Sequence, residues 1–320
     1  MVYILGENRC LCSSECDFPF PWFCRRCIHS HVLQPFTDLF GRCIIMIRKP
    51  AVAGQFYPDS PDELRKMIDF FMNQIILKGD VPDNIHGLIV PHAGYVYSGK
   101  RAAKAYKYIL DKDFRNVVVI SPSHREFFDF ISVYEGDGYE TPLGIIERCT
   151  DFDDYIHLSD GVFLSKTGHR NEHALEVQLP FLQIVLKAPF RLLPIVLGNQ
   201  NETNINRLSA FLKKIKSKDP ELLIVASSDL SHFHSVDMAT RMDGEWIQSM
   251  RKYDIKSLKD LFFSETCEAC GGGAIIALME SLKNNRNRIT VTGYSHSGEI
   301  NYDNSSVVGY TSAIIWEGEE

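Results

Sequence analysis

Three histidines stand a few residues beyond three apolar stretches of the chain. His92 follows the stretch 87–90, His124 follows 117–120, and His232 follows 222–226. In open α/β sheets, ligands bind beyond the carboxyl ends of the strands, so side chains that are far apart in sequence meet there. Imidazoles bind transition metals and exchange protons near neutral pH. The placement therefore predicts that the three histidines converge on one site with metal or acid–base chemistry.

Cys270 is a fourth candidate, because it precedes three glycines and the apolar pattern of a helix over 272–284. A helix N-terminus favours a thiolate, which would bind a metal or act as a nucleophile. The alternative is a small buried hydrophobic residue, the usual fate of a free cysteine. The glycines favour the first interpretation, since they let a ligand approach the backbone. Cys267, one turn earlier, is a second candidate for the same position.

Further polar groups could complete this site. Glu172 and His173 open a segment, 171–187, that we predict to be helical, with Glu176 on the same face as Glu172. The two carboxylates either line the pocket or form the acidic first turn of a helix. Asp229 either orients a histidine through a hydrogen bond or caps a helix after the strand 222–226.

The elements between these residues predict the fold. Ser60, Pro61 and Glu63 mark the start of a helix that extends to residue 73. Apolar, β-rich runs cover 87–90, 117–120, 192–197, 222–226, 289–292 and 312–316, and helical patterns cover 99–110, 203–217, 236–251 and 272–284. Residues 139–144 are expected to form a turn. The pattern predicts an α/β fold: a single three-layer domain with a largely parallel or mixed sheet flanked by helices.

Residues 1–45 differ from the rest of the chain. They hold six of the nine cysteines, together with His29 and His31, and Cys24 and Cys27 have the spacing of zinc ligands. One interpretation is a zinc-binding appendage. The other, which we adopt, is that an upstream start adds a segment that is not a domain, because it has too little periodic apolar sequence to build a core. Met46 is then the natural start, and 46–320 is the domain.

The composition excludes several classes of protein. With 320 residues, 45% of them hydrophobic, the chain can bury a large core. Its net charge of -7 gives no electrostatic reason to expect a nucleic-acid partner. No apolar run approaches the roughly 20 residues needed to cross a bilayer. We therefore expect no membrane partner and a cytoplasmic location, and a chain of this length needs no disulfide framework.

Taken together, the motifs resemble those of the Memo family, also known as protein B of the AmmeMemoRadiSam system. The resemblance covers residues 46–320 and rests on the stretches 48–58, 90–95, 121–124, 141–144, 172–173, 227–229 and 270–271. The family is similar in fold to the class III extradiol dioxygenases. Those enzymes hold Fe(II) with two histidines and a carboxylate, and they keep a further histidine nearby as an acid/base.

Carried over position by position, the resemblance makes His92 and His124 the histidine ligands and His232 the acid/base. Asp229 is the second expected catalytic residue, and Cys270 takes the place of the carboxylate ligand. The expected metal is Fe(II), although a thiolate also suits copper or zinc. The polar residues around the site that we expect to contact a substrate are Glu172, His173 and Tyr95.

Three functions agree with these residues. The first is a metal-dependent oxidoreductase or dioxygenase acting on a small aromatic diol or a related molecule, with His232 exchanging a proton with the substrate. The second, implied by family members linked to cell-motility signalling, is a non-enzymatic protein whose pocket binds a (phospho)peptide or a redox metal. The third is a Cys–His hydrolase with Cys270 as the nucleophile and His232 as the base. The name of the system also implies a functional link to a radical S-adenosylmethionine protein.

Overall fold

The computed structural model describes residues 45–77, 79 and 81–318. The predicted zinc ligands of the segment 1–44 lie outside the described residues. Residues Ile45–Glu320 form one compact unit. Within the part that the structure describes, no helix combines the length and apolar composition needed to cross a membrane.

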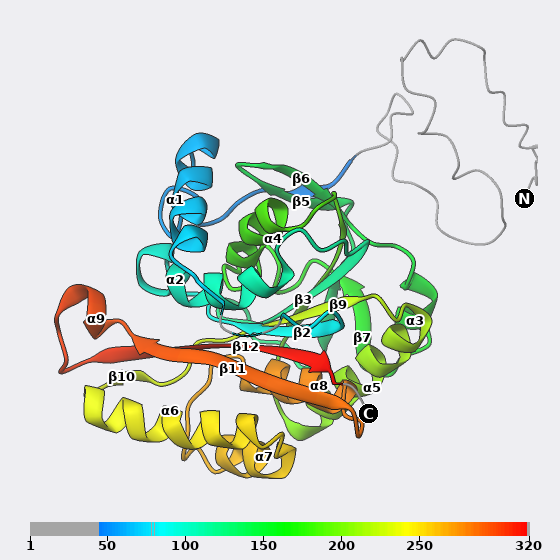
Figure 1. The fold of residues 1–320 in the computed structure, drawn as a ribbon. Helices are drawn as coiled ribbons and strands as arrows, with labels where there is room; N and C mark the ends of the chain where they lie inside the picture. Colours follow the sequence, from blue (N-terminus) through cyan, green and yellow to red (C-terminus); the bar gives the residue numbers. More distant parts are fainter. Residues whose placement is uncertain (1–44, 78, 80, 319–320) are drawn as a thin grey trace, which may run out of the picture. The chain divides into compact units, whose positions relative to one another are not determined.

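A nine-stranded mixed sheet forms the centre of the described residues (Figure 1). Its strands are β2 (Ile85–Val90), β3 (Asn116–Pro122), β4 (Ile131–Tyr134), β7 (Val162–Ser165), β8 (Arg191–Leu197), β9 (Leu223–Ser227), β10 (His232–His234), β11 (Asn287–His296) and β12 (Val307–Glu317). The order is β10-β12-β2-β9-β3-β8-β4-β7, and β11 also pairs with β12. The central strands β2, β9, β3 and β8 are parallel, whereas β12 and β4 are antiparallel to their neighbours β2 and β8.

A smaller sheet joins the start of the described chain to a hairpin. It contains β1 (Ile47–Arg48), β5 (Gly138–Thr141) and β6 (Gly144–Glu147), with β1 parallel to β5 and β5 antiparallel to β6. The turn predicted over 139–144 is therefore the tip of this hairpin, although its flanking residues belong to the strands.

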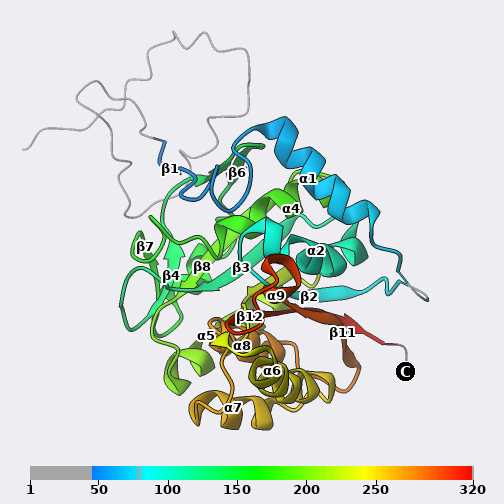
Figure 2. The ribbon, with the colours of Figure 1, turned by 90° about the vertical axis from the view of Figure 1, so that its left-hand side faces the viewer.

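Helices cover both faces of the large sheet (Figures 1 and 2). On one face lie α1 (Pro61–Asn73), α2 (Tyr95–Tyr106), the 3-10 turn η1 (Lys107–Ile109) and α4 (Leu179–Val185). On the other lie α5 (Glu202–Lys218), α6 (Val236–Arg251), α7 (Ile255–Phe263) and α8 (Gly272–Ser281). The short helices are α3 (Asp153–His157), η2 (Glu176–Gln178) and α9 (Gly298–Asn301).

The alternation of side chains along the strands explains the two layers. In β2, Leu88 and Val90 belong to one buried cluster and Ile89 to the other; in β3, Val119 and Ile120 divide in the same way. Both faces of these strands are apolar because both are covered, which is why the runs lacked a polar–apolar alternation in the sequence. The predicted α/β class, with a sheet flanked by helices, is confirmed.

The helix ends also follow the sequence. Ser60 accepts a hydrogen bond from the backbone N–H of Glu63, and α1 covers Pro61–Asn73 as predicted. The predicted helix 171–187 is shorter, since it consists of η2 and α4 and leaves Glu172 in the preceding loop. No helix follows β9 directly: the next one, α6, has Ser235 at its N-cap, so Asp229 is not a helix cap.

Candidate metal and acid–base site

The sheet order brings the predicted residues together. Strands β2, β9 and β3 are adjacent and parallel, so the chain segments that leave their carboxyl ends share one edge of the sheet. His92 follows β2, Asp229 follows β9, and His124 follows β3. This adjacency is the tertiary feature that the site requires.

His92 is held in one tautomer. Its Nδ1 lies 3.0 Å from Ser227 Oγ, whose own hydroxyl donates to the Ala174 carbonyl oxygen at 2.7 Å. Ser227 Oγ therefore accepts, and His92 Nδ1 carries the proton. Nε2 is left with its lone pair, and it faces Cys270 Sγ at 3.0 Å. Burial, then the nearby His124, lowers the pKa of His92 well below its ordinary value, so the ring is neutral.

His124 is oriented by a carboxylate. Its Nδ1 donates to Glu172 Oε1 at 2.9 Å, and its backbone N–H donates to Glu172 Oε2 at 2.6 Å. A second backbone donor, the Ala174 N–H, reaches Glu172 Oε1 at 2.9 Å. Burial alone would raise the pKa of Glu172, but the hydrogen bonds from His124 and Ala174 outweigh it and hold that pKa at about 2. As in His92, Nε2 is the nitrogen left with its lone pair.

His173 joins these two rings. One nitrogen from each of His92, His124 and His173 lies within 4.8 Å of the others. His173 Nδ1 is buried without a hydrogen-bond partner, 3.4 Å from Glu172 Oε1. Burial, followed by His92, lowers the pKa of His173 to about 4, which keeps this ring neutral as well. We predicted His173 as a substrate contact, and the structure adds that it is a candidate ligand beside His92 and His124.

Cys270 adjoins the histidines, because its Sγ faces Nε2 of His92. It immediately precedes Gly271, the N-cap of α8, as predicted, and its Sγ accepts the Asp229 backbone N–H at 3.2 Å. It is not a member of the three-histidine group, although it contacts His92. Burial, reinforced by the Asp229 carboxylate, raises the pKa of the Cys270 thiol well above its ordinary value. Burial thus opposes the effect of the helix N-terminus, which we expected to favour a thiolate.

Asp229 holds the backbone of His92 through a hydrogen bond. Its Oδ1 accepts the His92 backbone N–H at 2.8 Å, and Oδ2 lies 4.0 Å from His92 Nε2. Burial raises the pKa of Asp229. Of the two roles considered for this residue, the structure leaves the one in which it orients a histidine.

His232 approaches from the far edge of the sheet. It begins β10, and its backbone N–H donates to Glu268 Oε2 at 3.0 Å. Together with Cys270 it lines a cavity of about 910 Å³ formed by residues 199–202, 262–263, 265 and 267–270.

Tyr95 and Glu176 belong to the core instead of the cavity. Tyr95 is only 2% exposed, and its hydroxyl donates to the Val177 carbonyl oxygen at 2.6 Å. Glu176 is fully buried and pairs with Arg48. The predicted substrate contact of Tyr95 has no exposed hydroxyl to support it, and Glu176 is neither in the pocket nor in a solvated first turn. The sequence around Arg48, the partner of Glu176, gave no sign of this ion pair.

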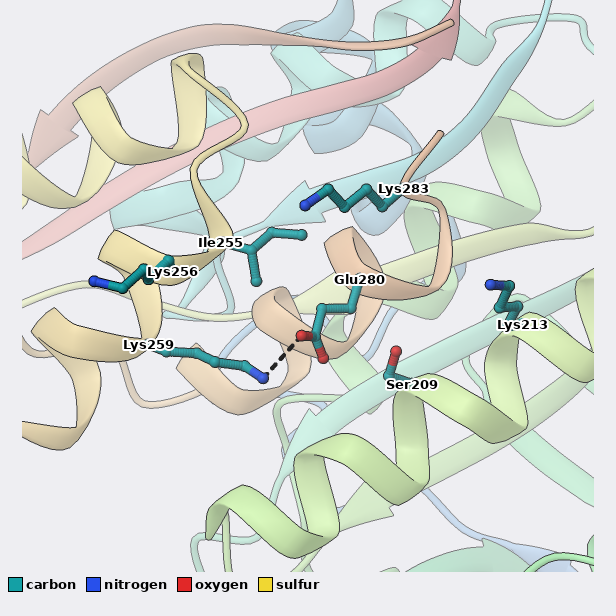
Figure 3. Close-up of a pocket in the computed structure, with 7 residues that line it drawn as sticks. All are labelled: Ser209, Lys213, Ile255, Lys256, Lys259, Glu280 and Lys283. Atoms are coloured by element: carbon teal, nitrogen blue, oxygen red, sulfur yellow. Dashed lines mark ion pairs between the residues drawn. The ribbon is translucent and has the colours of Figure 1, made fainter. Parts of the chain in front are cut away.

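A second cavity, of about 480 Å³, lies between α5, α7 and α8 (Figure 3). Four lysines line it, and Lys259 pairs with Glu280 at 2.8 Å. In Figure 3 the ammonium group of Lys256 points away from the other labelled side chains. None of its lining residues in the described ranges is a histidine or a cysteine, so this cavity is separate from the candidate site.

The donor set suits a transition metal. Two imidazoles present Nε2 while their Nδ1 groups are held by Ser227 and Glu172, the arrangement in which histidine binds metals. A third imidazole with an orphaned buried nitrogen and a sulfur atom stand beside them. Borderline and soft ligands of this kind select iron, copper or zinc over calcium or magnesium. The role of Ser227 as the partner of His92 was not predicted, because the sequence analysis named this residue only as part of the stretch 227–229.

Known proteins are similar to this chain over most of its length. The "Memo-like protein" family model matches residues 48–314. A MEMO1 family protein of Methanosarcina barkeri, Mbar_A1422, is 36% identical over 271 residues, which cover 84% of this chain and 100% of the relative. The MEMO1 family protein TV1383 of Thermoplasma volcanium is 35% identical over 271 residues, covering 84% and 98% of the two chains.

Among solved structures, an uncharacterized protein of Escherichia coli K12, JW3007, aligns with a TM-score of 0.46 and 12% identity, covering 72% of this chain and 99% of that one. The family match and the identities extend over nearly all of the described unit. This chain therefore belongs to the Memo-like protein family.

Proposed function

We propose that His92, His124 and Cys270 hold a metal ion, with iron(II) as the first candidate and copper or zinc as the others. One observation carries the proposal. The Nδ1 atoms of His92 and His124 are hydrogen-bonded to Ser227 and Glu172, which leaves the Nε2 lone pairs of both rings available to bind a metal. His173 contributes a further nitrogen within 4.8 Å of both rings.

The raised pKa of Cys270 agrees with this assignment. A buried thiol beside Asp229 stays protonated until a cation compensates for the lost solvation. A coordinated thiol, in contrast, is deprotonated. Cys270 is therefore expected to lose its proton when metal enters, so that metal binding releases a proton and strengthens as the pH rises.

The activity we propose is that of an oxidoreductase, most specifically a dioxygenase that adds both atoms of dioxygen to a small aromatic diol. When bound, the iron would supply the open coordination positions at which such a diol and dioxygen meet. His232 lines the cavity, which supports its proposed role of exchanging a proton with a hydroxyl of the substrate. Asp229 and Glu172 orient His92 and His124.

The first experiment is the metal content of the chain purified without oxygen. Wild type should carry near-stoichiometric iron or copper, and both His92→Ala and Cys270→Ala should lose it. Cys267→Ala is the matched control, because Cys267 is buried and its thiol donates to the Met242 carbonyl oxygen. Metal kept in Cys270→Ala but lost in His173→Ala would replace the proposed ligand set with the three histidines. A metal-free wild type would reject the proposal.

Catalysis is tested separately through His232. Dioxygen uptake with catechols should be lost in His232→Ala while the metal content stays at the wild-type level. Full turnover in this variant would exclude His232 as the acid/base.

A further inference from the structure

The cavity beside Cys270 and His232 is large enough to hold a small molecule. Its volume is about 910 Å³, within the range typical of ligand pockets. Three parts of the chain form it: the loop from β8 into α5, the end of α7 with the segment that leads into α8, and His232 at β10. Because Cys270 and His232 lie in its wall, the cavity is the route by which a substrate would approach the proposed metal site.

The charges of this wall have one sign. Glu202, Glu265 and Glu268 line the cavity, and no lysine or arginine does so among the residues that the structure describes. Glu268 is partly neutralised, since it accepts a hydrogen bond from His234 Nε2 at 2.9 Å. Glu202 and Glu265 are exposed and form no ion pair with any described residue.

The remaining wall is aromatic and amide-bearing. Phe263 is 44% exposed and packs beside Phe262 at a centroid distance of 5.4 Å. Such rings attract a cation over their faces and also stack with an aromatic ligand. Gln200 fixes the wall to the site, because its Nε2 donates to the Cys270 carbonyl oxygen at 2.7 Å and its Oε1 accepts the Gly273 N–H at 2.9 Å.

We propose that this cavity binds a small aromatic molecule that carries a protonated amine. The inference rests on the proposed function, because it names the substrate class of the same site. Carboxylates and exposed phenylalanine rings favour a cation with an apolar body. A phosphorylated peptide is the opposite case, since its phosphate would enter a wall that carries three carboxylates and no lysine or arginine from the described residues.

The test compares three phenols of similar size whose para substituents are cationic, neutral and anionic: tyramine, 4-ethylphenol and 4-hydroxyphenylacetate. Binding to the full chain is measured by calorimetry at pH 7.5. For carboxylates about 7 Å from the ligand charge, screened Coulomb energies predict roughly tenfold tighter binding of the amine than of the acid. The neutral phenol should fall between them, and 0.5 M salt should reduce the difference.

The carboxylates are tested by substitution. Glu202→Gln with Glu265→Gln should bring the affinities for amine and acid to within about threefold of each other. The matched control is Glu147→Gln, an exposed carboxylate on β6 outside the cavity, which should keep the wild-type preference.

Equal or tighter binding of the acid, binding of none of the three probes, or an unchanged preference in the double variant would overturn the inference. The metal content of the same samples reports on the proposed metal site independently. A metal-loaded protein without preference for the amine would reject the substrate class alone, whereas a metal-free protein would reject the proposed function.

Discussion

Glu176 offers a sharp test of how the site is held. Its carboxylate is fully buried and accepts hydrogen bonds from Arg48, the Tyr57 hydroxyl, and the backbone N–H groups of Ala51 and Val52, the last two at 2.8 and 3.1 Å. Arg48 is buried as well. We predict that Glu176→Gln, which keeps the size of the side chain and removes its charge, strongly destabilises the protein.

The magnitude follows from the burial of the pair. Removing one partner of a buried ion pair typically costs about 3–5 kcal/mol, because the other charge remains without solvent or counter-charge. That is a large part of the roughly 5–15 kcal/mol that stabilises a folded domain. Arg48 also donates to the carbonyl oxygens of His169, at 3.0 Å, and Glu172. A displaced Arg48 should therefore loosen Glu172 and lower the metal affinity of the site.

The assay is urea unfolding at pH 7, followed by fluorescence and circular dichroism. The matched control is Glu140→Gln, because Glu140 pairs with Lys49 at an exposed position and should cost less than about 1 kcal/mol. Adding Arg48→Met to Glu176→Gln should recover part of the loss, since the orphaned charge is then absent. A loss in Glu176→Gln no greater than in the control would refute this reasoning.

Two further predictions concern the core near the site. His169 donates through Nε2 to the Ser132 carbonyl oxygen at 3.1 Å and accepts the Tyr139 hydroxyl at Nδ1, and burial lowers its pKa to about 3. Between pH 6.5 and 3 the unfolded chain therefore binds a proton at this residue that the folded protein does not, so the free energy of unfolding falls as the pH falls through that window. At pH 4.5 wild type should have lost about 3 kcal/mol that His169→Gln does not lose. Urea midpoints measured as a function of pH would show the difference. An identical pH slope in both proteins would contradict the assignment. Gly271→Ala would place a Cβ 2.2 Å from a backbone oxygen of β9 and should lower the stability by about 1–3 kcal/mol in thermal unfolding. Gly244→Ala has open space around it in α6 and should instead raise the stability by about 0.5–1 kcal/mol. Equal effects of the two substitutions would be inconsistent with close packing at Gly271.

Much of the fold was readable from local patterns. The capped helix at Ser60 and the apolar runs that became β2, β3, β8 and β9 were predicted within a few residues. The segments that became β4, β6 and β7 were not, because each has only four residues, and the partners of β4 and β7 are also far away in the chain. The segment 171–187 forms less helix than predicted, since hydrogen bonds from His124 and Ala174 hold Glu172 in a loop.

The site was only partly predictable. Histidines after strand ends pointed to His92 and His124, and the glycines after Cys270 placed it before a helix. His173 was expected to face a substrate, yet its ring lies among the metal-binding candidates. The pair of Arg48 and Glu176 was missed altogether, because two residues separated by 128 positions leave no joint signal in one sequence.

The sequence by itself determined which residue types stand at strand ends, where the helices begin, and the resemblance to the Memo family. These properties are local, since propensity, capping and apolar periodicity act over a few residues. Only the tertiary structure decided that β2, β9 and β3 are neighbours, that Ser227 and Glu172 fix the tautomers of two histidines, and that burial raises the pKa of the Cys270 thiol. Strand order and desolvation depend on groups that are distant along the chain, and they exist only once the core has formed.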